Sequence, residues 1–167
     1  MSVILGIDPG SRVMGYGVIG VERHRVSHRA NGCIRLGDGA IADRLVTIFD
    51  TLSAIITEHR PDEAAIEKVF MQRNADSALK LGHARGVAML AASKAGLGVS
   101  EYSATRIKQA VVGRGHAAKG QVQHMVRALL DLEQAPQADA ADALATAICH
   151  AHMREGLAQL ALAGGRS

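Results

Sequence analysis

The sequence predicts an α/β protein in which helices flank a single mixed sheet, and three observations predict it. Short apolar runs of strand length lie close together at the start of the chain, beginning with residues 3–7. From Ala40 onward the apolar residues recur every three or four positions, as they do in an amphipathic helix. Later apolar runs are separated by helical segments, so those strands should lie parallel to the first.

The first three expected strands should form an antiparallel meander because the connections between them are short. Residues 3–7, Val-Ile-Leu-Gly-Ile, are typical of a buried strand, and the turn residues Asp8-Pro9-Gly10 end it. Residues 13–20 have the apolar content of a second strand, with glycines spaced by two. Residues 24–36 fit a third and more exposed strand.

Two helices and two strands alternate in the middle of the chain. The helix expected at 40–59 ends before Pro61, since proline disfavours the helical conformation of the residue that precedes it. A short buried strand at 64–66 leads directly into an acidic residue. The helix expected at 75–95 stops at the glycines that follow it, and residues 99–102 form the last expected strand.

Helices make up the rest of the expected structure. Two of them lie at 104–112 and 119–132, separated by a loop that contains two glycines. A third helix should start near Pro136, because proline is favourable in a first helical turn. Its apolar pattern continues to about Glu155.

The composition fits one globular domain and excludes several other classes of protein. At about 150 residues per domain, the chain of 167 residues predicts a single domain, expected at 1–156 with a flexible tail at 157–167. Two cysteines are too few for a disulfide framework, and no apolar run has the length of a membrane span. Because no signal peptide is recognisable, the cytoplasm is the expected location.

The net charge of +3 conceals an uneven distribution along the chain. Residues 1–67 carry a net charge of −2, residues 68–127 carry +8, and residues 128–167 carry −3. A basic middle segment between acidic ends indicates an anionic partner, with nucleic acid as the leading candidate. A solvated basic face that has no partner accounts for the same charges.

Four acidic residues stand where an acid is locally costly. Asp8 and Glu67 each end an apolar strand, and the carboxyl ends of parallel strands meet at the edge of the sheet where α/β folds place their sites. Asp139 and Asp142 lie three residues apart on the last expected helix, so they share one face of it. The alanines around them would let this helix approach a sheet or a metal closely.

Convergent carboxylates repel one another unless cations lie among them. Hard divalent cations with oxygen ligands, Mg²⁺ above all, meet that need. A pair of such ions suits the in-line hydrolysis of a phosphodiester and requires no side-chain nucleophile. Each acid also has an ordinary role open to it: Asp8 in a turn, Glu67 in an ion pair, Asp139 in a first helical turn, and Asp142 on an exposed helix face.

Six motifs follow one another in order along residues 3–147. They are GIDPGSRV at 6–13, AIEKVF at 65–70, NADSALKLG at 74–82, KQAVVG at 108–113, KGQV at 119–122 and DAADALA at 139–145. Together they resemble the RuvC family of Holliday-junction resolvases. Met14 stands where that family often has threonine, which is a departure outside the four acids.

The resemblance implies a ribonuclease H-like α/β fold with a mixed five-stranded sheet, three strands antiparallel and then two parallel. It implies a homodimeric endonuclease that resolves four-way (Holliday) junctions in homologous recombination and DNA repair, by symmetric nicking of two strands. The implied cofactor is Mg²⁺, two ions per active site, with Mn²⁺ able to substitute, and the implied protein partners are RuvA and RuvB. Asp8, Glu67, Asp139 and Asp142 correspond to the four catalytic, metal-binding acids of the family.

Aromatic and basic residues near the acids are candidates for DNA contacts. By the resemblance, Phe70, one of only four aromatic residues in the chain, corresponds to a residue proposed to stack on an unpaired base. Lys108 and Lys119 correspond to lysines near the DNA. Arg73 and Arg114 are further candidates for phosphate contacts. The ordinary alternatives are a core position for the phenylalanine and a solvated surface for the basic residues.

The helix expected at 75–95 places Gly82, Gly86 and Met89 on one side. That side packs either on the chain's own sheet or against the same helix of a second subunit. A two-fold dimer would match a reaction that needs two equivalent cuts.

Two other functions fit parts of the sequence. The segment Asp8-Pro9-Gly10-Ser11 also resembles the phosphate loop of actin-like ATPases and sugar kinases. Those proteins usually need a second lobe, for which 167 residues leave no room. The other alternative is a junction-binding protein without catalysis, but its acids would oppose DNA binding unless metal neutralised them.

Overall fold

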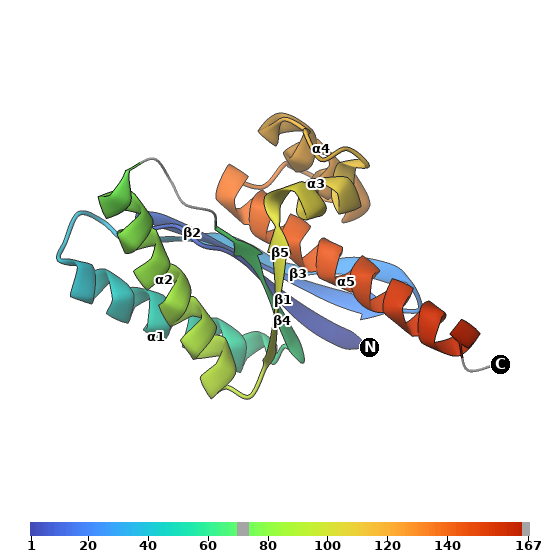
Figure 1. The fold of residues 1–167 in the computed structure, drawn as a ribbon, viewed down its shortest axis with the longest axis horizontal. Coiled ribbons are helices and arrows are strands. Elements are labelled where there is room, and N and C mark those ends of the chain that lie inside the picture. Colours follow the sequence, from blue (N-terminus) through green and yellow to red (C-terminus); the bar gives the residue numbers. More distant parts are fainter. Residues whose placement is uncertain (70–73, 165–167) are drawn as a thin grey trace.

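In a computed structural model, the chain folds around a five-stranded sheet with helices on both faces (Figure 1). The structure describes residues 1–69 and 74–164, with the backbone alone described at 119 and 157–164. The strands are β1 (Ser2–Asp8), β2 (Val13–Glu22), β3 (Arg25–Arg35), β4 (Glu63–Lys68) and β5 (Gly98–Ser103). The helices are α1 (Ile41–His59), α2 (Ala75–Lys94), α3 (Ala104–Val112), α4 (Lys119–Leu129) and α5 (Ala138–Gly164).

The strand order in the sheet is β3-β2-β1-β4-β5. The first three strands pair antiparallel, as their short connections predict, while β4 pairs parallel with β1, and β5 pairs parallel with β4. Both parallel strands are reached through helices that cross over one face of the sheet. The expected α/β class with its mixed five-stranded sheet is therefore confirmed.

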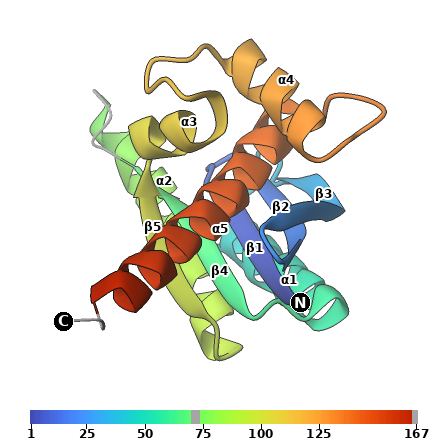
Figure 2. The same ribbon diagram turned by 90° about the vertical axis from the view of Figure 1, so that its right-hand side faces the viewer.

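The helices form two layers around the sheet. Helices α1 and α2 cover one face, and α5 crosses the other face with α3 and α4 over its amino-terminal half (Figures 1 and 2). Side chains alternate along β1, so that Leu5 and Ile7 pack toward α1 and α2 while Ile4 packs toward α5. Aliphatic residues and alanines fill both cores, as the scarcity of aromatic residues predicts.

Helix α5 lies unusually close to the sheet because glycines face it. A Cβ atom added at Gly6 would lie 2.1 Å from the carbonyl oxygen of Ala143, and one added at Gly15 would lie 1.9 Å from that of Asp139. No side chain fits in either place, so the helix backbone rests directly on β1 and β2. The close approach expected from the alanine-rich sequence is confirmed.

Helix α2 buries one side and exposes the other. Its small residues, among them Ala84 and Ala88, pack into the core, and Met89 packs against the same cluster. No heavy atom that the structure describes lies within 4 Å of a Cβ added at Gly82 or Gly86. The two glycines therefore do not pack on the chain's own sheet. Met89 follows Gly82 by seven residues, nearly two helical turns, so it lies toward their side as predicted, and its partly buried side chain reaches the core cluster.

Helix α5 is longer than the sequence predicts. The apolar pattern predicts that the helix ends at about Glu155, whereas the helix continues to Gly164. Gly156 costs about 1 kcal/mol relative to alanine, but the leucines and alanines after it are strong helix formers. The single domain at 1–156 and the flexibility of 157–167 stay predictions. Among the helices of the described residues, none combines the length and hydropathy that a membrane span requires.

Candidate active site

The parallel pairing of β1 and β4 brings two of the predicted acids to the same edge of the sheet. Ile7 and Ile66 are register partners, so Asp8 and Glu67, the next residue in each strand, lie side by side at the carboxyl ends. Both side chains are partly exposed at this edge. The prediction that the two acids emerge together from neighbouring strands is confirmed.

The other two acids are brought to this edge by the start of α5. Asp139 lies in the first turn of the helix, and Asp142 follows one turn later. The contact of the Asp139 backbone with Gly15 of β2 places this turn against the sheet, next to the end of β1. The helix therefore presents its two carboxylates to those of the strands.

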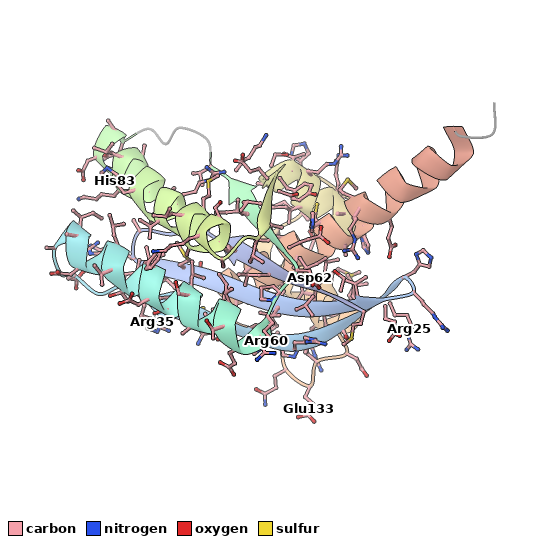
Figure 3. The ribbon with its side chains drawn as sticks, turned by 90° about the horizontal axis from the view of Figure 1, so that it is seen from below. Arg25, Arg35, Arg60, Asp62, His83 and Glu133 are labelled. Carbon is pink, nitrogen blue, oxygen red and sulfur yellow. The ribbon has the colours of Figure 1, made fainter. Side chains whose placement is uncertain are left out.

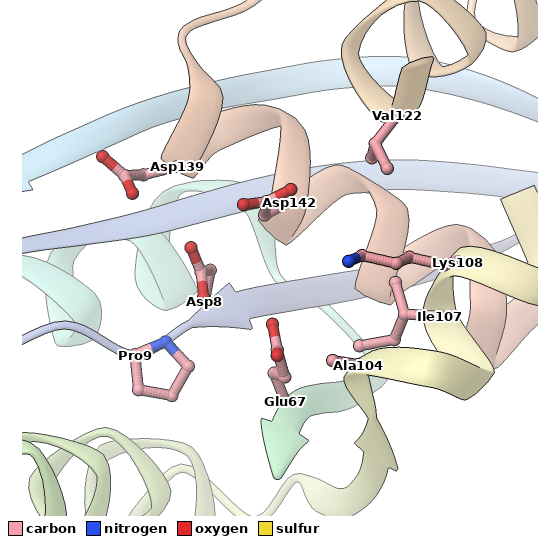
Figure 4. Close-up of a pocket in the computed structure, with 9 residues that line it drawn as sticks. All are labelled: Asp8, Pro9, Glu67, Ala104, Ile107, Lys108, Val122, Asp139 and Asp142. Atoms are coloured by element: carbon pink, nitrogen blue, oxygen red, sulfur yellow. The ribbon is translucent and has the colours of Figure 1, made fainter. Parts of the chain in front are cut away.

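All four acids line one pocket with a volume of about 290 Å³. Asp8 and Glu67 rise from the strand ends, and Asp139 and Asp142 project from α5 above them (Figure 4). The remaining lining residues come from the turn after β1 and from α3 and α4: Pro9, Ala104, Ile107, Lys108 and Val122.

Lys108 supplies a positive charge to this acidic pocket. It lies on α3, and its ammonium group points toward the carboxylates (Figure 4). Lys108 is therefore placed to attract an anionic group toward the acids, as its prediction as a DNA contact requires.

The end of β4 is supported from the opposite face of the sheet. The guanidinium of Arg85, on α2, donates a hydrogen bond of 3.2 Å to the backbone carbonyl of Glu67. The same guanidinium forms an ion pair with Glu101 of β5. These contacts tie together α2 and the two parallel strands beside the site.

The other predicted DNA contacts lie at the start of α4, in the loop before it, or outside the described residues. Lys119 begins α4, as expected from the loop before it. Arg114 is exposed in the loop between α3 and α4. Phe70 and Arg73 fall in the segment 70–73, which lies outside the described residues.

The donor atoms of the pocket suit a hard divalent cation. Carboxylate oxygens are the ligands that Mg²⁺ prefers, and four carboxylates line this one space. Within residues 1–69 and 74–164, no three His, Cys, Asp or Glu side chains are gathered closely enough to hold an ion as they stand. The residue types fit a metal centre, and the side chains would have to draw together around the ion.

Sequence reasoning missed the apolar wall of the pocket, which is formed by Ala104, Ile107 and Val122. A signal was available, because Ile107 directly precedes Lys108 and Val122 lies one helical turn after Lys119. The packing of α3 and α4 on α5 decides which of their faces turn toward the acids. The spacing of apolar residues in the sequence does not predict that packing.

Comparison with known proteins identifies the family. The family model described as crossover junction endodeoxyribonuclease RuvC matches residues 4–150. The chain belongs to the RuvC family. A RuvC of Marinobacter nauticus is 58% identical over 99% of this chain and 95% of its own length. A RuvC of Aeromonas salmonicida is 62% identical over 96% of this chain and 93% of its own.

A solved structure agrees with this assignment. The RuvC of T. thermophilus, solved in complex with a Holliday junction substrate, matches with a TM-score of 0.87 and 35% sequence identity, over 93% of this chain and 97% of its own. The ribonuclease H-like fold expected from the motifs is thereby confirmed. Membership of a family of endodeoxyribonucleases decides against an ATPase and against a binding protein without catalysis.

Proposed function

We propose that this RuvC protein resolves four-way DNA junctions by metal-dependent nicking of two strands of like polarity, in homologous recombination and repair. The observation that carries the proposal is the pocket in which strand-end acids Asp8 and Glu67 face Asp139 and Asp142 of α5. The T. thermophilus relative, solved with a Holliday junction, supports the choice of substrate.

The four acids are proposed as the catalytic, metal-binding residues. Their carboxylates would hold Mg²⁺, with two ions per site and Mn²⁺ able to substitute. When bound, these ions supply activation of the attacking water and stabilisation of the leaving 3′ oxygen. No side chain of the pocket is needed as a nucleophile. The acids act by binding the metal ions and by orienting them.

The basic residues around the pocket are proposed to hold the DNA. Lys108 would draw the phosphate of the cut strand toward the acids, because its ammonium group lies at the pocket. Arg114 and Lys119 would contact phosphates near the start of α4, where helix geometry favours anions. Phe70 as a stacking residue and Arg73 as a phosphate contact rest on the motif resemblance alone.

We further propose a homodimer formed through the exposed side of α2. Leu79 and Leu90 are 62% and 55% exposed, although both are large apolar residues on a helix. Gly82 and Gly86 lie between them in the sequence and leave room for another backbone to approach. A two-fold arrangement would present two equivalent sites to a junction that needs two cuts.

The location and the protein partners are proposed from family membership. A cytoplasmic location fits a nuclease that acts on bacterial DNA. RuvA and RuvB remain the proposed branch-migration partners.

The decisive test compares Asp8→Asn with Asp50→Asn, a control that changes an exposed acid of α1. The substrate is a synthetic mobile four-way junction, incubated with and without Mg²⁺. We expect Asp8→Asn to bind the junction and not to cut it, while the control cuts at the wild-type rate. Cutting by Asp8→Asn would show that the catalytic site lies elsewhere, and cutting by the wild type without divalent metal would exclude the proposed chemistry.

A further inference from the structure

A second pocket lies on the other flank of the first turn of α5. Its volume is about 320 Å³, and three of its six lining residues have polar side chains: the lining is Asn31, Gly32, Cys33, Arg35, Gln137 and Ala140. Gln137 and Ala140 bracket the first turn of α5, which also carries Asp139 of the acidic pocket. The same helical turn therefore separates the two pockets.

Strand register relates the second pocket to the catalytic acids. Asp8 pairs with Gly15, and Gly15 pairs with Cys33 on the outermost strand. Two strand spacings of about 4.8 Å each separate Asp8 from Cys33. Register partners have side chains on the same face of a sheet, so Cys33 and Arg35, two positions on, lie on the α5 face with Asp8.

The charges along this edge of the sheet have an order that the chain sequence hides. Arg35 ends β3, the acids follow at the ends of β1 and β4, and Lys108 follows β5 on α3. The acidic centre thus has a cation on each flank. Arg35 is exposed and lines the second pocket, and Lys108 lines the first.

A DNA strand that crosses the acidic centre also passes both of its flanks. Each strand of a duplex carries one phosphate per about 3.4 Å of helix axis. A strand that places one phosphate at the acids therefore extends further phosphates past both flanks. An attractive contact on each side offsets the repulsion by the carboxylates and sets which phosphate reaches them.

The second pocket has the chemistry to hold one phosphate. The guanidinium of Arg35 offers several donors in a planar fork that matches two phosphate oxygens. The Gln137 side chain adds a neutral amide donor at the other wall. Asn31 is held in place by His28, with 2.7 Å between the amide and imidazole nitrogens.

We propose that this second pocket binds a backbone phosphate of the cut strand, on the side of the scissile phosphate opposite to Lys108. Arg35 makes the contact and acts as a positioning residue that selects which phosphate enters the acidic pocket. The proposal rests on the proposed junction nuclease function and adds a binding subsite to it. Sequence reasoning gave no reason to single out Arg35, because residues 1–67 carry a net negative charge.

The first test compares Arg35→Gln with Arg25→Gln. Both arginines are exposed on β3 and lie at its opposite ends (Figure 3). Binding of a four-way junction is measured without divalent metal over a range of salt concentrations. We expect Arg35→Gln to bind about three- to fivefold more weakly. The slope of the logarithm of the binding constant against the logarithm of the salt concentration should fall in magnitude by about 0.9 per lost contact. Arg25→Gln should match the wild type.

The second test replaces single phosphates by neutral methylphosphonates on each side of the cut. We expect one or two linkages on one side to weaken wild-type binding and to have no effect on Arg35→Gln. This coupling requires a direct contact, and a variant that merely folds less well does not produce it.

Two results would overturn the subsite. One is an Arg35→Gln variant that matches Arg25→Gln in affinity and salt slope, and the other is an equal response of wild type and variant to every neutral linkage. Failure of the wild type to bind or cut the junction would instead overturn the proposed function. The two failures are therefore distinguishable.

Discussion

The imidazole of His150 joins Glu63 to α5, with 2.8 Å between its Nε2 atom and a carboxylate oxygen of Glu63. Its Nδ1 atom lies 2.7 Å from the hydroxyl of Tyr102 on β5. The guanidinium of Arg154, one helical turn further along α5, forms an ion pair with the other Glu63 oxygen and donates a 2.9 Å hydrogen bond to Ser2. This partly buried network ties α5 to three strands: Ser2 and Glu63 begin β1 and β4 at the end of the sheet opposite the acidic pocket, while Tyr102 lies near the carboxyl end of β5.

The network affects the candidate site through the helix itself. His150 lies eight residues after Asp142 on α5, which corresponds to about 12 Å at 1.5 Å per residue. The backbone contacts at Gly6 and Gly15 hold the helix to the sheet nearer its amino-terminal end. Two separated attachments define the direction of a rigid helix, and that direction positions the carboxylates it carries.

Replacing Glu63 by Gln should change the pH dependence of stability. Although burial by itself raises the pKa of Glu63, the hydrogen bonds from His150 and Arg154 outweigh it and lower the pKa from its ordinary value of 4.5. A lowered pKa stabilises the fold above about pH 4.5, and that stabilisation is lost as the pH falls through the folded-state pKa. Urea unfolding should therefore show the largest difference between wild type and Glu63→Gln above pH 4.5.

The matched control is Glu133→Gln, which changes an exposed acid in the loop before α5 (Figure 3). Plotted against pH, the free energy of unfolding of this variant should run parallel to that of the wild type. A Glu63→Gln curve that also stays parallel would show that the His150 network does not stabilise the fold through the Glu63 charge.

Adding one methyl group at Gly15 should disturb the start of α5. The new Cβ atom would meet the carbonyl oxygen of Asp139 at 1.9 Å, so the first turn of the helix must move. We expect Gly15→Ala to cost about 1–3 kcal/mol of the free energy of unfolding and to reduce junction cutting.

Gly156→Ala provides the comparison within α5, because Gly156 is exposed and no described heavy atom lies within 4 Å of an added Cβ. That change should stabilise the helix by up to about 1 kcal/mol. Equal unfolding free energies for the two variants would contradict the close packing of the helix on β2.

Introducing a charge on the exposed side of α2 should produce monomers. Leu90→Glu places a carboxylate on a side chain that is 55% exposed, so the fold of the subunit should lose less than about 0.5 kcal/mol. Light scattering after size exclusion should give the mass of one chain. Val46→Glu changes a residue of α1 that is 58% exposed and should leave the mass unchanged. A dimeric Leu90→Glu variant would place the subunit contact elsewhere.

The two cysteines should differ in reactivity toward a thiol reagent. Burial raises the pKa of Cys149 to about 11, which leaves about one thiolate in a thousand at pH 8. Burial also raises the pKa of Cys33, but this side chain is partly exposed at the second pocket. In the folded protein, Cys33 should be labelled slowly. Cys149 should be labelled only after the protein is unfolded. Mass mapping of the labelled peptides checks this, and early labelling of Cys149 would contradict its burial.

Local patterns predicted most of the fold and the acids of the site. Strand-length apolar runs and the helical period gave the order of elements, and every expected element is present with boundaries shifted by a few residues, apart from the end of α5. Asp8 and Glu67 could be placed at one edge because the strands that they end had to be parallel. These inferences succeed because periodicity and chain connectivity are properties of the sequence itself.

The sequence by itself thus determined the strand and helix order, the family and the four acids. The tertiary structure decided that Lys108 points into the pocket, that His150 is buried against Glu63, and that Arg35 flanks the acids from the outermost strand. The physical reason is that these relationships depend on strand register and on the contact of α5 with Gly6 and Gly15. Such contacts join residues far apart in the chain, and no local pattern of the sequence records them.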